Sequence, residues 1–235
     1  MKTSEKSSEG NLILNHLPER MTDEIRPHLK QIEMPLGEVL YRPREKIEYI
    51  YFPETSVVSL VTCLENGDSV EAGIVGKEGV VGAAIIFADG ISHTEAATQL
   101  GGSGQRMRVS DFKNCFNDSR EFRDAVLYHI YSYIVQISQN SACLCYHTIE
   151  KRFARCLLMF ADRANRETLV LTQQFIAQML GVKRPSVSVN AARLQRMQLI
   201  KYNRGTIRIL DRKALQNLAC ECYREISLSL GGFSE

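Results

Sequence analysis

Basic and hydroxyl side chains gather in residues 183–189, where the chain reads Lys-Arg-Pro-Ser-Val-Ser-Val. The guanidinium of Arg184 carries paired N–H donors that match the two acceptors on the major-groove edge of guanine. The hydroxyl groups of Ser186 and Ser188 bond either a base edge or a phosphate oxygen. Such side chains are typical of a surface that reads a nucleic acid, if one rigid element presents them together.

The surrounding residues predict such an element. Apolar residues at helical spacing predict a helix over 173–180, and Gly181 then permits the backbone of a tight turn. Pro185 suits the first turn of a second helix, because an N–H in that turn has no bond to lose. The buried stripe expected for the second helix is Val187, Ala191 and Leu194. Residues 200–210 read as strand, turn, strand, so the whole predicts a winged helix-turn-helix, whose second helix lies in the DNA major groove.

Five residues at the front and outer face of the second helix are expected to face base edges: Arg184, Pro185, Ser186, Ser188 and Val189. Arg184 is the best candidate for a bidentate bond to guanine, worth about 1–3 kcal/mol of discrimination. Val189 offers only apolar contact, for instance to a thymine methyl group. Base specificity is therefore expected to depend mainly on Arg184.

Five other residues are expected to contact phosphates. Thr172 and Gln173 lie at the start of the preceding helix, where free N–H groups favour an anion. Lys183, Arg193 and Arg204 would add phosphate contacts that position the protein without reading sequence. The alternative for Arg193 and Arg204 is a solvated surface charge, which is common on any soluble domain.

Charge is distributed unevenly along the chain of 235 residues, which has a net charge of +2. Residues 1–145 contain 14 basic and 20 acidic residues, whereas residues 146–235 contain 15 basic and 7 acidic residues. This asymmetry favours a nucleic-acid-binding domain joined to a sensing or dimerising domain. No charged-then-apolar leader and no apolar run of about 20 residues is present, so we expect a cytoplasmic protein with reduced cysteines. No phosphate-binding glycine loop, nucleophile elbow or zinc-protease motif is present, so we do not expect an enzyme.

Three segments are predicted: a sensor domain over 12–120, a dimerisation helix over 121–145 and a DNA-binding domain over 146–235. The first dozen residues are polar and are expected to be disordered. Short apolar runs over 31–109, broken by turns, predict a β-barrel or sandwich, with a hairpin at Asn66-Gly67 and another turn at residues 101–104. A short terminal helix is predicted over 214–226.

The predicted helix over 121–145 has an apolar stripe that includes Phe122, Val126, Tyr133 and Ile137. This stripe either joins two copies of the chain or packs on the chain's own barrel, and its spacing alone does not separate the two. A two-fold DNA site requires a dimer, which favours the first interpretation.

Two stretches carry a resemblance to a known family: Thr-Gln-Gln-Phe-Ile-Ala-Gln-Met-Leu-Gly-Val at 172–182 and Arg-Gly-Thr-Ile-Arg-Ile-Leu-Asp at 204–211. Together with the order of barrel, long helix and winged helix-turn-helix, they resemble the Crp/Fnr family of bacterial transcription regulators. The resemblance implies an α+β chain whose N-terminal domain is a double-stranded β-helix, the jelly roll related to cyclic-nucleotide-binding domains. It also implies a homodimer on a near-palindromic site in double-stranded DNA, with RNA polymerase as a further partner.

The chain departs from the family at the sites that bind effectors. Cyclic-nucleotide binders pair Gly-Glu with a later Arg-Ser or Arg-Thr, where this chain has residues 82–85 (Gly-Ala-Ala-Ile) and 93–97 (His-Thr-Glu-Ala-Ala). A buried phosphate would lack its counter-charge, so we expect no tight cyclic AMP binding. The first cysteine is Cys63, which excludes the family's N-terminal iron–sulfur cluster, and no histidines show a haem-ligand arrangement. The effector is therefore unknown, and no cofactor is expected.

Two further features leave alternatives open. Cys143-x-Cys145 near His147, and Cys220-x-Cys222, are either redox or metal sites or idle buried thiols. Paired zinc ligands usually have two residues between them, not one, so we expect no metal. The alternative function is an effector-binding module whose basic C-terminal domain contacts a protein instead of DNA. The DNA half-site is also open, because relatives that read TGTGA-type sites have Glu and Arg where Pro185 and Val189 stand here.

Overall fold

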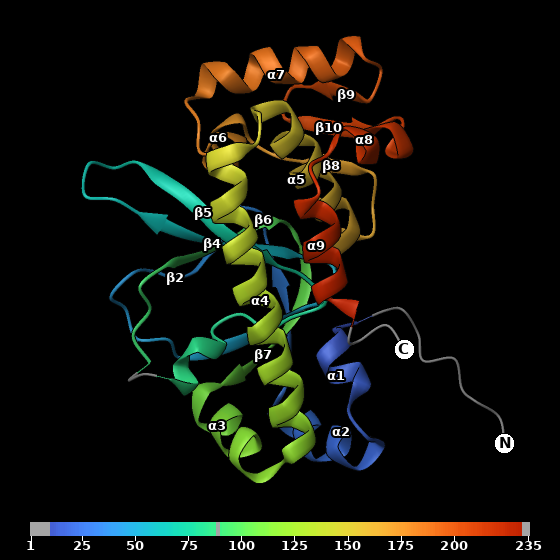
Figure 1. Cartoon of the computed structure of the whole chain (residues 1–235). Helices are drawn as coiled ribbons and strands as arrows, with labels where there is room; N and C mark the ends of the chain where they lie inside the picture. Colours follow the sequence, from blue (N-terminus) through green and yellow to red (C-terminus); the bar gives the residue numbers. More distant parts are fainter. Residues whose placement is uncertain (1–9, 88–89, 232–235) are drawn as a thin grey trace, which may run out of the picture.

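The computed structural model describes residues 10–87 and 90–231 of the chain. Residues 1–9 of the segment expected to be disordered, and the last four residues of the predicted DNA-binding domain, lie outside the described residues. A long helix, α4 (Arg120–Tyr146), runs along the molecule with two β-sheets beside it (Figure 1). The helix-turn-helix lies at one end of α4 and helices α2 (Glu19–Ile25) and α3 (Val109–Asp118) at the other (Figure 1).

The N-terminal half contains two antiparallel sheets, with strand orders β1-β7-β3 and β2-β6-β4-β5. Two short elements precede or follow α2, namely α1 (Leu12–His16) and η1 (Arg26–His28). The strands and the 3-10 turn among them are β1 (Lys30–Met34), β2 (Val39–Tyr41), β3 (Tyr49–Pro53), β4 (Val57–Cys63), β5 (Ser69–Val75), η2 (Ala83–Ile86), β6 (Glu95–Leu100) and β7 (Gly102–Arg108). The predicted β-rich N-terminal half is therefore confirmed.

Of the two predicted turns, one is confirmed and one is wrong. Asn66-Gly67 closes the β4–β5 hairpin, in which Cys63 pairs with Ser69. Residues 102–104 belong instead to β7, which lies between β1 and β3. A Cβ atom at Gly104 would lie 2.7 Å from Met34 Sδ and 2.8 Å from the Phe52 carbonyl oxygen. The glycines therefore permit close packing across strands, a use that the sequence does not distinguish from a turn.

The apolar stripe assigned to dimerisation faces the chain's own sheets. Phe122 and Val126 are fully buried, and the buried face continues through polar side chains. The Gln136 amide accepts from the Ile74 N–H and donates to the Ile74 carbonyl, both at 3.0 Å. The Asn140 amide donates to the Ala72 carbonyl at 2.8 Å. Strand β5 thus offers backbone groups to α4, which explains why polar residues interrupt the apolar stripe.

The C-terminal half contains α5 (Ile149–Ala164), β8 (Thr168–Val170), α6 (Gln173–Leu180), α7 (Arg184–Arg196), β9 (Ile200–Asn203), β10 (Thr206–Ile209), α8 (Arg212–Leu218) and α9 (Cys222–Ser229). The two predicted wing strands form a sheet with a third strand, in the order β8-β10-β9. The prediction of a single terminal helix over 214–226 is wrong, because the helical structure is interrupted at residues 219–221, between α8 and α9. Cys220 and Cys222 at this break are buried beside Cys143 of α4, a contact that no local pattern reveals.

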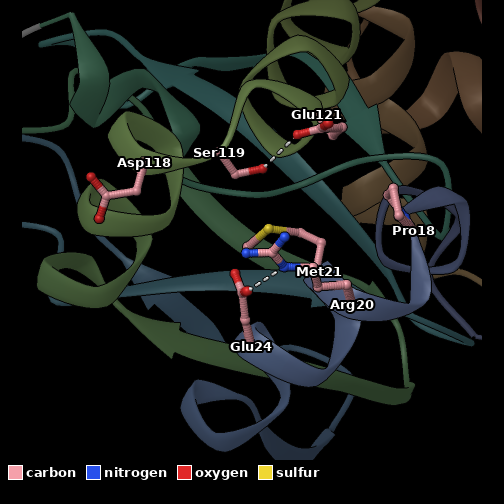
Figure 2. Close-up of a pocket in the computed structure, with 7 residues that line it drawn as sticks. All are labelled: Pro18, Arg20, Met21, Glu24, Asp118, Ser119 and Glu121. Carbon is pink, nitrogen blue, oxygen red and sulfur yellow. Dashed lines mark hydrogen bonds and ion pairs between the residues drawn. The ribbon is translucent and has the colours of Figure 1, made fainter.

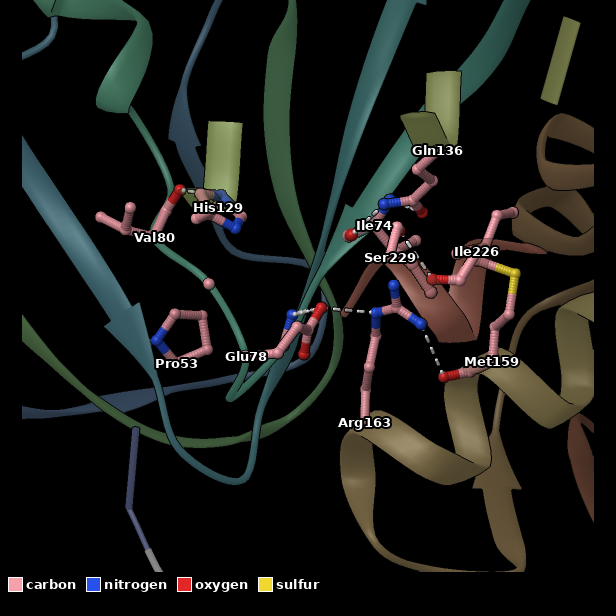
Figure 3. Close-up of polar contacts among 12 residues, drawn as sticks. Pro53, Ile74, Glu78, Val80, His129, Gln136, Met159, Arg163, Ile226 and Ser229 are labelled. Carbon is pink, nitrogen blue, oxygen red and sulfur yellow. Dashed lines mark hydrogen bonds and ion pairs between the residues drawn. The ribbon is translucent and has the colours of Figure 1, made fainter. Parts of the chain in front are cut away.

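Polar contacts join the two halves. The Arg163 Nε of α5 donates to Glu78 Oε1 at 2.7 Å, and both side chains are buried (Figure 3). The Gly76 N–H also donates to Glu78 Oε1, at 3.1 Å. At the tip of the β4–β5 hairpin, Asp68 pairs with Lys183 at 3.4 Å. The loop after β5 and the hairpin before it therefore both contact the C-terminal half.

Candidate nucleic-acid interface

The helix-turn-helix has the local structure that its sequence predicts. Thr172 caps α6, and its hydroxyl accepts the Phe175 N–H at 3.1 Å. Gly181 ends α6 in the left-handed conformation, with φ of 60°. Helix α7 then begins with Pro185 in its first turn. Its buried stripe is Val187, Ala191 and Leu194, as predicted.

The opposite face of α7 is open to solvent. Helix α7 forms the outermost edge of the molecule at this end (Figure 1). Pro185, Ser188 and Val189 are exposed, and Val189 exposes 67% of its surface.

Arg184 is held at the front of this face by α6. Its Nε donates to Gln173 Oε1 at 2.9 Å, and Gln173 Nε2 lies 3.4 Å from the Ser188 hydroxyl. The Arg184 side chain is exposed. A hydrogen bond through Nε leaves the terminal nitrogens of the guanidinium available for a bidentate contact. Gln173 thus has a positioning role that the sequence did not suggest.

The predicted phosphate contacts differ in their surroundings. Lys183 is exposed and paired with Asp68, and Arg193 pairs with Glu150 at 2.9 Å. Arg204 is exposed in the wing turn and forms no ion pair with any described residue. Ser186 is half-buried, while Thr172 is exposed and caps α6. All ten predicted residues therefore lie on the α6–α7–wing side of the domain, but two of the cations already have carboxylate partners.

The structure adds basic residues that sequence analysis missed. Arg196 is exposed on the last turn of α7, four and seven residues beyond Ala192 and Val189 on the same face. Lys201 and Arg208 are exposed and pair across β9 and β10 of the wing. Extending the helical period from Val189, and the two-residue alternation along the wing, would have found all three. These cations enlarge the basic surface around α7.

A separate cavity of about 390 Å³ lies between the four-stranded sheet and α4. It is lined by Tyr41, Ile47, Leu60, Ala72, Val75, Val80, Gly82, Ala83, Ala84, Phe87, Ile91, Ser92, His93, Thr94, His129, Tyr133 and Ile137. No Lys, Arg, Asp or Glu occurs among these described residues. Residues 82–84 and 93–94, from the two stretches that stand where cyclic-nucleotide binders have their phosphate-binding cassette, therefore line the cavity.

His129 is a buried titratable group that lines this cavity. Its Nε2 lies 3.1 Å from the Val80 carbonyl, so Nε2 carries the proton (Figure 3). Burial lowers the pKa of His129 to about 4, opposed by the charge of Glu78 and by the bond to Val80. A Cβ atom at Gly79 would lie 2.2 Å from the imidazole. Position 79 therefore needs glycine to admit a neutral histidine.

A second pocket, of about 290 Å³, lies between α2 and the start of α4 (Figure 2). Its lining includes Glu24, Asp118 and Glu121, and the Arg20 side chain is paired with Glu24 at 3.2 Å. The pocket contains none of the predicted site residues and lies at the end of the molecule away from α7 (Figure 1). Its acidic lining does not suit a polyanion.

Comparisons with known proteins agree with this geometry. The model of the Crp-like helix-turn-helix domain matches residues 151–218. None of the curated proteins matches the chain in sequence. No helix within residues 10–87 and 90–231 is long and apolar enough to cross a membrane.

Several solved structures share the fold. FixK2 from Bradyrhizobium japonicum is 19% identical with a TM-score of 0.69, covering 82% of this chain and 98% of its own. The c-di-GMP responsive global regulator CLP from Xanthomonas campestris is 14% identical with a TM-score of 0.68, covering 83% and 100%. A Crp/Fnr-family transcriptional regulator from Thermus thermophilus is 20% identical with a TM-score of 0.66, covering 81% and 98%. The chain therefore shares the fold of these regulators, and its residues 151–218 match a Crp-like helix-turn-helix domain.

Proposed function

We propose that this chain is a transcription regulator of the Crp/Fnr type, which acts as a homodimer and reads a near-palindromic DNA site through α7 of each copy. The observation that carries the proposal is the exposed outer face of α7, with Arg184 held at its front by Gln173. The match of residues 151–218 to a Crp-like helix-turn-helix domain supports DNA binding. The geometry supports sequence-specific reading, because a rigid guanidinium is the commonest reader of guanine. A DNA-binding regulator works beside the genome, so we expect it in the bacterial cytoplasm, with RNA polymerase as a further partner.

We assign the ten predicted residues to two roles. The residues assigned to base edges are Arg184, Pro185, Ser186, Ser188 and Val189. The residues assigned to the DNA phosphate backbone are Thr172, Gln173, Lys183, Arg193 and Arg204. Lys183 is paired with Asp68, and Arg193 is paired with Glu150. On binding DNA, each cation must either leave its carboxylate for a phosphate or contact both groups. The Lys183–Asp68 pair is exposed at both ends, and such pairs contribute only about 0–1 kcal/mol, so Lys183 can exchange its partner readily. Glu150 is largely buried, so Arg193 gives up its partner less readily. Each phosphate neutralised adds about −0.9 to the slope of log K against log salt.

The outer face of α4 supports the homodimer. Leu127, Tyr131 and Ile134 expose 40%, 58% and 56% of their surfaces. Their spacing of four and three residues places them on one side of the helix, opposite the face that packs on the sheets. Three large exposed apolar groups in a row mark an interaction surface. We assign it to a second copy of the chain, because a two-fold DNA site requires two recognition helices related by symmetry.

The cavity beside α4 is proposed as the effector site. Its lining is mainly apolar and uncharged within the described residues, which favours a neutral small molecule over a cyclic nucleotide. The Tyr133 and Ile137 side chains connect the cavity to the helix proposed for dimerisation. Isothermal titration with cyclic AMP tests the exclusion: micromolar affinity would contradict it.

Charge reversal separates DNA binding from the alternative, in which the basic domain contacts a protein. The double variant Lys183→Glu and Arg184→Glu is expected to abolish DNA binding. The matched control is Arg224→Glu on α9, which reverses an equally exposed cation away from α7. Binding to genomic DNA fragments, measured by fluorescence anisotropy, should be lost in the first and kept in the second. Equal binding by both variants would contradict the assignment of α7.

A further inference from the structure

Four metal-ligating side chains converge where α4 ends and α9 begins. Cys143 lies in the last turn of α4 and His147 is its C-cap. Cys220 lies in the break between α8 and α9, and Cys222 is the first residue of α9. One ligand atom of each lies within 4.8 Å of every other. The three thiols are buried. The sequence shows two separate Cys-x-Cys pairs. In the fold, Cys143 and His147, four residues apart, lie together with Cys220 and Cys222. Cys145 is exposed and is not part of the cluster.

The distances suit one tetrahedral ion. Cys143 Sγ lies 3.4 Å from Cys220 Sγ, and Cys222 Sγ lies 3.6 Å from His147 Nδ1. Bonds of about 2.3 Å to sulfur and about 2.0–2.1 Å to nitrogen give tetrahedral edges of about 3.5–3.8 Å between ligands. These two pairs of ligand atoms are therefore already near the spacing that a zinc ion imposes, and all four ligand atoms lie within 4.8 Å of one another. Three cysteines and one histidine are an established structural zinc set.

The Glu221 carboxylate lies beside the ring nitrogen of His147 that does not face Cys222. His147 Nε2 lies 3.2 Å from Glu221 Oε1. Because Nδ1 faces Cys222, the proton belongs on Nε2, where it is donated to Glu221. Histidines that bind zinc commonly donate their other N–H to such a carboxylate, which fixes the ring and its tautomer. The cluster thus has the outer support of a metal site as well as its ligands.

A buried cation beside the cluster supplies charge balance. Arg155 of α5 is only 4% exposed, and Nη1 donates to Asn140 Oδ1 at 2.8 Å. Among the described residues it has no carboxylate within ion-pair distance. Zn²⁺ with three thiolates carries one net negative charge, which would offset the buried guanidinium.

We propose that Cys143, His147, Cys220 and Cys222 bind one structural Zn²⁺ ion that fastens the C-terminal helix to α4. Four protein ligands leave no open position, which is the pattern of a structural site. Helix α9 lies along α4 (Figure 1), and the hydroxyls of Tyr128 and Ser132 donate to the Ser229 carbonyl near its end. The ion therefore adds the strongest link between the helix proposed for dimerisation and the segment that follows the wing. This proposal is independent of the DNA site and its effector.

Metal content of the full-length protein, purified under reducing conditions, is the first test. We expect one zinc per chain in the wild type by plasma mass spectrometry, and visible absorption of a tetrahedral thiolate complex after Co²⁺ replacement. Cys145→Ser, which removes the neighbouring exposed thiol, should keep the metal, whereas Cys143→Ser and Cys220→Ser should lose it. Wild-type protein that takes up no zinc or Co²⁺ after reduction would overturn the proposal, as would iron with acid-labile sulfide.

A milder variant guards against misfolding of the cysteine variants. Glu221 is exposed, so Glu221→Gln should fold while losing the support of His147. Competition with a chromophoric chelator should show roughly 10- to 100-fold weaker zinc binding. Chelation should also lower the melting temperature of the wild type and of Cys145→Ser. Unchanged affinity in Glu221→Gln together with an unchanged melting temperature on chelation would contradict a structural site at this position.

Discussion

At the scale of single residues, the proposed DNA reading depends most on Arg184. Its side chain is exposed, it lies in the first turn of α7, and its Nε is held by Gln173. Lys183 and Arg193 beside it are occupied by carboxylates in this structure. Residues that position the protein and residues that read bases should therefore respond differently to substitution.

Replacing Arg184 by Ala should weaken binding to the preferred site by about 1–3 kcal/mol and relax the preference at one base pair of each half-site. The reason is the loss of a bidentate bond with little loss of phosphate contact. Quantitative binding to a panel of sites mutated at each position measures both effects. Lys183→Ala is the matched control, because it should weaken all sites equally. A uniform loss in Arg184→Ala would contradict base reading.

Glu71 provides a second prediction at this scale. It is buried on β5 and accepts the Ser59 hydroxyl at 2.6 Å. Burial raises the pKa of Glu71 to about 7, opposed by the Ser59 bond and by the charges of Arg155 and Arg163. The folded protein therefore holds a proton that the unfolded chain releases near pH 4.5, so stability falls as pH rises from about 4.5 to about 7.

Glu71→Gln should remove this pH dependence, because the amide is neutral throughout. Relative to the wild type, the variant should gain up to about 3 kcal/mol in unfolding free energy between pH 4.5 and pH 8. Urea denaturation of both proteins at the two pH values measures the difference, and every other titrating group cancels in the comparison. An identical pH dependence in the two proteins would show that Glu71 is ionised when buried.

At the scale of elements, local signals predicted α6 and α7 well and α4 less well. Thr172, Gly181 and Pro185 mark helix ends chemically, so the limits of α6 and α7 follow from the sequence. The apolar stripe of α4 was visible, but its partner was not, because periodicity does not show what a helix face packs against. Gln136 and Asn140 are buried on α4 because β5 offers them backbone groups, which no local pattern reports.

The outer face of α4 yields a prediction about assembly. Leu127→Glu combined with Ile134→Glu should convert the dimer to a monomer, because charges on both turns of the apolar face cannot be buried unpaired. Sedimentation velocity measures the assembly state, and circular dichroism checks that α4 remains folded. Leu228→Glu on α9 is the matched control, since Leu228 is 67% exposed on a different helix. A double variant that stays dimeric would place the interface elsewhere.

At the scale of the whole molecule, contacts distant in sequence explain what the sequence did not predict. The Glu78–Arg163 pair and the cysteine cluster each join residues more than 70 positions apart. The first ties α5 to the loop after β5, and the second ties the segment between α8 and α9 to α4. The Glu78 loop leads directly into the cavity lining at Val80, and Arg163 lies at the end of α5. Breaking a buried pair costs about 3–5 kcal/mol, so this contact is suited to transmit a change at the cavity to the DNA-binding domain.

The fold class, the winged helix-turn-helix and most of its exposed face were thus predictable, because they follow from periodicity, caps and turns. Arg196 was missed only because the helical period was not extended from Val189 to the last turn of α7. The role of Gln173, the split between α8 and α9, and the meeting of Cys143 with Cys220 were not predictable, since each depends on tertiary packing.

Selection of DNA sites from a random library with the purified full-length protein, at two salt concentrations, tests the central proposal most directly. We expect a two-fold symmetric motif whose half-sites lie about 34–36 Å apart. Binding should weaken with salt by a slope of about −0.9 for each phosphate contacted. An enriched motif without two-fold symmetry would contradict the homodimeric reading, and no enriched motif at either salt concentration would contradict sequence-specific recognition by α7.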